Sequence, residues 1–553
     1  MARVYDRFMR ERITRRRLLR AAGGSALGAA GIYVVACGGG GADGDGAPTG
    51  VASPAAEGTP RPGGILKLRQ TATIPNFNPF GSGIAALIQG LYLGYTVFDH
   101  LWFVPTDTGE VINFLATDIE TIDPQTVRVS MGEAVFQDIP PVSGRDVRST
   151  DLKASIERFR EQVPLGFSWL HEVFERIDAP DNRTVVYHQQ RPWAWFFTAS
   201  NAGSPISSSI IPEEIVRDDE FLNDGAIGSG RWILAGHEAG TNVQFRKFEN
   251  YREAPLPYLD GVDNVYAPDD TLAQAAFGAQ DIDRITGLNR IERDDLESSF
   301  GDQISFDTDL SRSYRTLMLK NEPPFDDPDV RHAISLALDR DEIRQVMNLG
   351  DGELCGPLPP AHELFVLDEN DPDLQEYFRH DPQDARQMLE AAGFPFDQEI
   401  TLKYSNFETA PDLGELVGKQ LRDIGLNINL PGPEDLVAWL ANTLGPGNFQ
   451  MTSFTHLPYE DPSLPLRFYV EPNFMGYKDD DVEQAFRAAA ETLDEEERIE
   501  LTKEAQRVLI RKWAPMINLY SPTSFGATWD YVKGLILGRG SFGLFNTTVW
   551  LDK

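Results

Sequence analysis

The first 37 residues constrain this chain most, because they determine the compartment in which the rest must fold. Consecutive arginines precede a short apolar run, and the run closes with Val-Val-Ala-Cys. Twin arginines before such a run are typical of a Tat signal peptide, and small residues before a cysteine are typical of lipoprotein cleavage. The pattern predicts a Tat-type lipoprotein signal peptide over residues 1–36. The residues that carry it are Arg15, Arg16, Arg17 and the lipidated Cys37.

The apolar run at residues 21–35 is open to a second interpretation, a membrane-spanning helix. Its fifteen residues, rich in Gly and Ala, fall short of the ~20 that span a bilayer. No later apolar stretch approaches that length, so we expect a soluble body held by a lipid anchor. The expected location is the cell envelope, on the outer face of the cytoplasmic membrane or in the periplasm.

The chain is strongly acidic, with a formal net charge of -35. Eight arginines and two carboxylates lie in residues 1–36, so removing that segment would change the net charge to -41. Contacts to nucleic-acid phosphates need clustered Lys and Arg, which an acidic surface does not supply. Nucleic acid is therefore excluded as a partner.

Only two cysteines are present, Cys37 and Cys355. If Cys37 is acylated, Cys355 has no partner and the exported protein has no internal disulfide. We expect Cys355 to be a small packed side chain, with a functional thiol as the alternative. A chain of 553 residues is too long for one core and should divide into two or three lobes.

Beyond the cysteine, composition separates a spacer from an ordered body. Residues 37–62 are mainly Gly, Ala, Pro, Thr and Asp, so they cannot bury enough apolar surface to fold and are predicted to be a flexible linker. Order should begin at residues 63–69, where apolar residues alternate as in a strand. Strand-like and helix-like stretches then mix to the end of the chain, which predicts an α/β body.

Three helices are predicted from their end signals. Asp327-Pro328 and Asp381-Pro382 each place a capping carboxylate before a first-turn proline, and Gly393 should end the second helix. A third helix is expected over residues 413–424, followed by a strand at 426–430. The apolar stripes should face the core; they comprise Val330, Ala333, Ile334, Ala337 and Leu338 in the first helix and Ala385, Met388, Leu389 and Ala392 in the second.

Motifs of catalysis are missing. No G-x-S-x-G segment occurs, and His171-Glu172 and His362-Glu363 lack the second histidine of a zinc-binding H-E-x-x-H helix. A G-x-G-x-x-G does occur at 538–543, but the ten residues after it are too few for a dinucleotide site. We therefore expect no enzyme, no metal site and no cofactor, although carboxylate pairs remain open from sequence alone.

Ordered motifs from Gly63 to the C-terminus resemble the family 5 solute-binding proteins of ABC importers, which are receptors for peptides, nickel complexes and some oligosaccharides. The most specific block is 323–341, similar to the family's P-P-F-x-D-x-x-V-R-x-A-I-x-x-A-I-D-R. Further matches in order are Ile74–Pro79, Asp146-Val147 with Ser155, Glu157 and Arg158, Gly228–Trp232, Asn250-Tyr251, Pro257–Asp260, Gln280–Asp283, Gly356–Pro360 and Asp461-Pro462.

The resemblance implies an α/β, two-lobed, three-domain fold of the type II periplasmic-binding-protein class, with a hinge and an interlobe cleft. Lobe 1 is expected at 63–310 with a smaller inserted domain at about 101–224, and lobe 2 at 311–521. Residues 522–553 should return to lobe 1. Hinge closure would bury a ligand in the cleft before docking on a permease, without covalent chemistry.

The same resemblance places residues 454–461 at the family's cleft-facing loop. Aromatic side chains would cover the ligand while His456 and Asp461 fix its polar ends. The alternative is that Trp439 and Phe454 belong to the core. The candidate ligand-binding residues are Asn76, Phe77, Trp439, Phe454, His456, Tyr459 and Asp461.

This loop departs from that of the peptide-binding members. They commonly carry an aspartate a few residues before Asp-Pro, which pairs with the free amine of the peptide, whereas this chain has His456-Leu457-Pro458-Tyr459. A buried ammonium needs a charge partner. A free peptide is thus one option for the ligand, and an oligosaccharide or a nickel complex is another, although His456 alone does not make a metal site.

Three functions are compared. The first is a lipid-anchored receptor, expected to be monomeric, that delivers a peptide-like or other polar solute to ABC permease subunits. The second is a ligand sensor of the same fold for a membrane signalling partner, which a neighbouring permease and ATPase gene set would distinguish. The third is an exported enzyme on the same scaffold, which the missing motifs disfavour.

Overall fold

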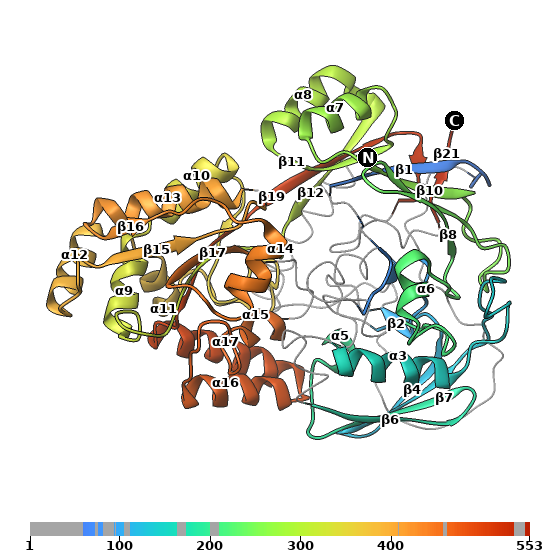
Figure 1. Ribbon diagram of the computed structural model, residues 1–553, viewed down its shortest axis with the longest axis horizontal. Helices are drawn as coiled ribbons and strands as arrows, with labels where there is room; N and C mark the ends of the chain where they lie inside the picture. The colour runs from blue at the N-terminus through green and yellow to red at the C-terminus, as the bar shows by residue number, and fades with distance from the viewer. Residues whose placement is uncertain are drawn as a thin grey trace, which may run out of the picture. The chain divides into compact units, whose positions relative to one another are not determined.

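Two mixed sheets and one antiparallel sheet organise the chain in the computed structural model (Figure 1). The structure describes residues 59–71, 74, 76–80, 93–94, 96–103, 111–162, 173–199, 209–407, 409–456, 462–535 and 548–553. The predicted signal peptide, Cys37, the linker to residue 58 and the 538–543 motif lie outside these ranges. Among the described residues, no helix combines the length and apolarity needed to cross a membrane.

The first sheet has seven strands in the order β12-β19-β11-β1-β10-β9-β8. Its central strand β1 begins at Ile65, close to the predicted start, and pairs in parallel with β10 and β11. The strands are β1 (Ile65–Gln70), β8 (Trp232–Glu238), β9 (Asn242–Lys247), β10 (Gly261–Tyr266), β11 (Arg284–Leu288), β12 (Ile304–Leu310) and β19 (Thr523–Trp529). Helices α6 (Asp219–Asp224), α7 (Asp270–Gly278) and α8 (Arg290–Phe300) belong to the same part of the chain.

The second sheet has six strands in the order β14-β18-β13-β17-β15-β16. They are β13 (Arg315–Leu319), β14 (Glu353–Leu354), β15 (Glu399–Lys403), β16 (Asn427–Asn429), β17 (Met451–Thr455) and β18 (Met516–Ser521). The helices between them are α9 (Pro328–Ala337), α10 (Arg340–Asn348), α11 (Pro372–Phe378), α12 (Pro382–Ala391), α13 (Ala410–Asp423), α14 (Leu436–Trp439), α15 (Ser463–Arg467), α16 (Asp480–Glu491) and α17 (Glu495–Arg511).

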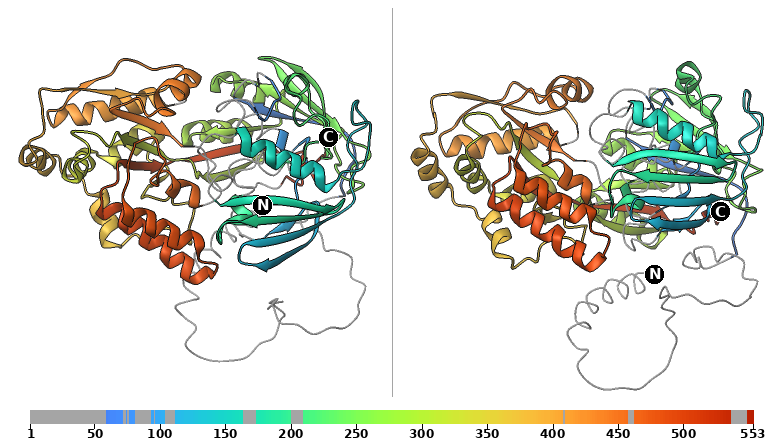
Figure 2. Two further views of the ribbon diagram at one scale, coloured as in Figure 1. Left: turned by 60° about the horizontal axis from the view of Figure 1, so that its bottom comes forward. Right: turned by 90° about the horizontal axis from the view of Figure 1, so that it is seen from below.

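A third sheet of four antiparallel strands has the order β4-β5-β7-β6 and carries α3 (Figure 2). Its elements are β4 (Ala116–Asp123), β5 (Thr126–Met131), α3 (Ser149–Gln162), β6 (Phe174–Asp181) and β7 (Thr184–Gln189), followed by α5 (Phe196–Ala199). Two short pairs complete the described strands, β2 (Trp102–Phe103) with β3 (Ile112–Asn113) and β20 (Val532–Lys533) with β21 (Trp550–Leu551).

The predicted helix signals are confirmed at their N-termini. Asp327 caps α9 by accepting from the Asp329 N–H, and Asp381 caps α12 in the same way from Asp384. In each helix the proline takes the first position, where its missing N–H costs no hydrogen bond. The third helix also forms, with bounds three residues earlier at its start than predicted, and Gly425 follows it with φ +94°.

One predicted core position is wrong. The α9 stripe is buried, but Ala392, assigned to the inward face of the second helix, is exposed. The helix ends at Ala391 and Gly393 turns the backbone with φ +70°, so Ala392 lies past the last helical turn. The periodicity that orients a side chain stops where the helix stops.

The α9 stripe provides a test of the second sheet's core. Ile334 is 0% exposed, and Ile334→Ala should lower the free energy of unfolding by about 2–5 kcal/mol, because the side chain is lost and a cavity remains. Val346→Ala, at a side chain 59% exposed on α10, should change it by less than about 0.5 kcal/mol. Urea unfolding measures both; equal effects would contradict the packing described here.

Candidate functional site

Five ring-bearing side chains gather at the carboxyl end of β17, and we call them the aromatic cluster: Tyr314, Trp439, Phe454, His456 and Phe468. Trp439 stacks on Phe454 with ring centroids 5.5 Å apart, and Phe454 meets His456 edge-on at 4.5 Å. His456 in turn stacks on Tyr314 at 4.1 Å and meets Phe468 edge-on at 4.8 Å. The cluster thus joins three of the predicted ligand-binding residues, Trp439, Phe454 and His456, the first and last of which are 17 positions apart in sequence.

Strand pairing explains why these residues meet. β17 pairs antiparallel with β13, with Phe454 opposite Thr316. His456 directly follows β17, and its N–H donates to the Tyr314 carbonyl at 2.9 Å, which extends the pairing by one step. Tyr314 is therefore positioned by the strand before it rather than by any local pattern. Tyr314 was not among the predicted residues, because strand register is not visible in a single segment.

Burial differs within the cluster. Trp439 and His456 are fully buried, whereas Phe454 is half-buried. Trp439 ends α14, and a π-helical turn at Leu440–Leu444 follows it directly. Such turns are rare and often mark functional sites. Among the described residues the Trp439 Nε1–H has no hydrogen-bond partner, so a buried donor is left unsatisfied beside Phe454.

His456 is electrically neutral at physiological pH. Burial lowers its pKa well below the ordinary value, and the positive charge of Arg315 lowers it further. Its Nε2 lies 3.4 Å from the Thr316 hydroxyl. A neutral imidazole can exchange hydrogen bonds but cannot serve as a cation. His456 can therefore orient a polar group without carrying a charge of its own.

Asn76 and Phe77 lie in the segment that follows β1. The Phe77 ring is buried and meets His237 edge-on at 5.0 Å, and its N–H donates to the Asn223 carbonyl at 3.2 Å. Asn76 accepts from the Asn78 N–H at 3.1 Å, which forms a local turn. Phe77 nevertheless belongs to the same large cluster of buried apolar side chains as Trp439, against which Phe454 and Phe468 pack. Tyr459 and Asp461 lie outside the described residues, so the full ligand-binding set stays a prediction.

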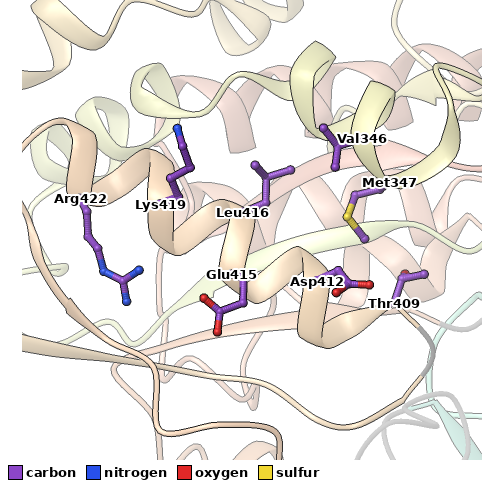
Figure 3. A pocket seen from close by; sticks show the side chains of 8 residues that line it. All are labelled: Val346, Met347, Thr409, Asp412, Glu415, Leu416, Lys419 and Arg422. Atoms are coloured by element: carbon purple, nitrogen blue, oxygen red, sulfur yellow. The ribbon is translucent and has the colours of Figure 1, made fainter.

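A surface groove lies elsewhere, between the end of α10 and one face of α13 (Figure 3). Its volume is about 530 Å³. Apolar Val346, Met347 and Leu416 line it together with charged side chains of both signs, and none of the predicted ligand-binding residues contributes. The remaining lining residues are Thr409, Asp412, Glu415, Lys419 and Arg422. The groove is the outer surface of α13, whose opposite face packs in the core.

In the described part of the chain, no three His, Cys, Asp or Glu side chains are grouped so that they could hold a metal ion. Cys355 is a buried free cysteine, and burial raises the pKa of its thiol well above the ordinary value. A protonated, buried thiol is unreactive, as expected for a packed side chain.

Curated solute-binding proteins are similar to this chain in sequence. The di/tripeptide-binding protein 2 of Pseudomonas aeruginosa is 24% identical over 442 residues, 70% of this chain and 76% of the relative. The glutathione-binding protein GsiB of Pectobacterium atrosepticum is 24% identical over 264 residues, 47% of this chain. That match spans about half (49%) of the relative's length.

A solved structure of the same fold covers almost the whole described body. The periplasmic binding protein DppA of Helicobacter pylori, in complex with peptide STSA, aligns with a TM-score of 0.75 and 21% identity over 89% of this chain and 99% of that chain. The likeness confirms the mixed α/β periplasmic-binding-protein fold. Residues 111–474 match the model of the bacterial extracellular solute-binding proteins, family 5. The chain belongs to this family of extracellular solute-binding proteins.

Proposed function

We propose that the protein is a lipid-anchored extracytoplasmic receptor that captures a peptide-like or other polar solute and delivers it to ABC permease subunits. The observation that carries the proposal is the family match over residues 111–474. Proteins of family 5 are non-enzymatic transport receptors, in agreement with the missing catalytic motifs. A lipid on Cys37 would hold the receptor beside its permease.

The proposed binding mechanism is closure of two lobes about a hinge. It is supported by strand membership, because the seven-stranded sheet takes its strands from residues 65–310 and 523–529 and the six-stranded sheet from 315–521. The chain passes between the sheets only twice among these strands, at residues 311–314 and at Pro522. Few crossing segments permit rigid bodies to rotate against each other.

The proposed ligand site lies at the aromatic cluster, with the half-buried ring of Phe454 as its apolar surface. Buried rings with a few polar groups suit enclosed ligands. Because His456 is neutral, it does not replace the aspartate that pairs with a peptide amine. A free amine would need Glu460 or Asp461 instead, which follow in sequence.

A ligand panel tests this proposal directly. Thermal unfolding of the full chain is measured with short free peptides, their N-acetylated forms, glutathione, oligosaccharides and nickel chelates. A ligand that binds only the folded state stabilises it by about 2.7 kcal/mol at a hundredfold excess over its dissociation constant. A shift with free but not acetylated peptides would identify a carboxylate anchor. No shift with any solute in the panel would contradict a polar-solute receptor.

Phe454→Ala separates ligand binding from core packing. If Phe454 covers the ligand, the variant should weaken binding of the panel's best solute about tenfold or more, equivalent to 1.4 kcal/mol. Its thermal midpoint should fall no further than that of Phe378→Ala, a half-buried phenylalanine on α11 outside the aromatic cluster. Isothermal titration and thermal unfolding give both values. A large loss of stability with unchanged affinity would assign Phe454 to the core.

Acid should destabilise the protein through His456 and His362. Burial with the nearby Arg315 charge lowers the pKa of His456 well below its ordinary value, and burial with the Arg312 charge lowers the pKa of His362 to about 3. In the unfolded chain both titrate near about 6.5. Below that pH the unfolded state therefore binds more protons, and stability falls as the pH falls.

Each histidine should contribute up to about 1.4 kcal/mol per pH unit below pH 6.5. Urea unfolding at pH 7 and pH 5 measures the loss in the wild type. His456→Gln and His362→Gln should each reduce the difference between the two pH values, because glutamine does not titrate. If both variants lose as much stability between pH 7 and pH 5 as the wild type does, groups other than these histidines govern the acid response.

A further inference from the structure

The segment that follows β7, residues 191–195, packs against the carboxyl end of α16, and we call it the latch. The two elements are almost 300 residues apart in sequence. Ala194 donates its backbone N–H to the carbonyl of Ala490 at 2.7 Å. Figures 1 and 2 show α16 beside the four-stranded sheet from which the latch emerges. This contact joins elements that strand pairing does not connect.

The hydrogen bond meets a need of the helix. The last four carbonyls of an α-helix have no partner within it, and α16 ends at Glu491, so the Ala490 carbonyl is one of these. Arg191 lies at the same end, with its Nε 3.1 Å from a carboxylate oxygen of Glu491. Positive charge is favourable at a helix C-terminus. The latch therefore caps α16 both by a hydrogen bond and by charge.

Two tryptophans add an apolar contact. Trp193 meets Phe486 of α16 edge-on with ring centroids 6.0 Å apart, and Trp195 meets Trp193 at 6.1 Å. Trp193 is 3% exposed and Trp195 4% exposed. Phe486, Ala489 and Ala490 belong to the same apolar cluster as both tryptophans. Separation of the latch from α16 would return this surface to water.

The closed contact also carries a penalty. Among the described residues, neither the Trp193 Nε1–H nor the Trp195 Nε1–H has a hydrogen-bond partner. A buried donor without an acceptor opposes burial. The contact is therefore less favourable than its apolar area implies, which suits an interface that opens and closes. A solute that supplied an acceptor to either donor would favour the latched state.

A different set of contacts ties the two large sheets near the crossing at Pro522. Arg290 of α8 makes two hydrogen bonds to the Asp351 carboxylate, at 3.0 and 2.9 Å, and the Asn348 side chain donates to the Thr523 carbonyl at 3.0 Å. Contacts beside a crossing segment move little when rigid bodies rotate about it. The latch belongs to no crossing segment. Rotation of the lobes about the crossing segments would therefore break the contact between the latch and α16 first.

We propose that residues 191–195 are a latch that closes on α16 when the lobes close and holds the closed conformation. The proposal rests on the hinge motion of the proposed function. It assigns Trp193 and the Arg191–Glu491 pair a role in retaining solute, apart from the aromatic cluster. The ties at Arg290 and Asn348 should persist in the open conformation.

Cross-linking tests whether the latch forms and opens in solution. The full chain with Cys37→Ser carries Arg191→Cys and Glu491→Cys, and a short bis-maleimide joins the two new thiols; each single variant is the control. Cys355 is buried and stays unreactive. We expect rapid cross-linking of the pair only, and a smaller mean radius of gyration by X-ray scattering after cross-linking. No cross-link, or an unchanged radius, would overturn the proposal.

Hydrogen exchange without ligand tests the individual contacts. Trp193→Ala and Glu491→Gln should each speed amide exchange in residues 191–196 and at the end of α16, about tenfold for Trp193→Ala. Glu471→Gln, which removes an exposed ion pair with Lys478, is the matched control and should change neither region. Exchange at 349–352 should stay unchanged in all three.

Equal exchange in the wild type and both latch variants would overturn the proposal. So would exchange in 191–196 as slow as in the buried strands, because the contact would then be permanent. These outcomes do not depend on the identity of the solute. If no solute of the panel binds, the proposed receptor function is contradicted. The latch is still tested separately, by cross-linking and by hydrogen exchange.

Discussion

The double passage of the chain between the two large sheets is the constraint on which the rest depends. At this point the Ser311 N–H donates to the Pro522 carbonyl at 2.9 Å, and the Ser521 hydroxyl donates to the Ser313 carbonyl, also at 2.9 Å. The two crossing segments are thereby hydrogen-bonded to each other. β13 begins and β18 ends here, and the pairing of β13 with β17 then brings Tyr314 to His456.

The protonation state of His456 follows from its buried position at the end of β17. Burial keeps the imidazole of His456 neutral, and the positive charge of Arg315 lowers its pKa further. The proposed site, built from rings and a neutral imidazole, would recognise shape and hydrogen-bonding groups more readily than an ammonium. This agrees with the missing aspartate of the loop, and it is the reason why the proposed ligands include polar solutes other than free peptides.

Local signals in the sequence were sufficient to predict where α9 and α12 begin and to which family the chain belongs. Asp-Pro pairs fixed the starts of α9 and α12, because capping and the proline ring act within a few residues. The predicted burial of Ala392 was wrong because the apolar stripe was extended past the end of the helix. Of the proposed site residues, Phe454 and His456 were predicted from the family's loop and Trp439 from its aromatic-rich segment, whereas the contacts of Tyr314, Phe468 and the latch were not predicted. Their contacts depend on strand register and on packing between segments far apart in the chain.

The sequence by itself determined the class of this protein: an export pattern, an α/β body and the ordered motifs of extracellular solute-binding proteins. Composition and local patterns carry this information because signal peptides, helix ends and family motifs are short. Only the tertiary structure decided that His456 is buried and neutral, that Phe77 packs against His237, and that Ala194 caps α16. A pKa and a long-range contact are set by neighbours in space, and the chain order does not state which neighbours those are.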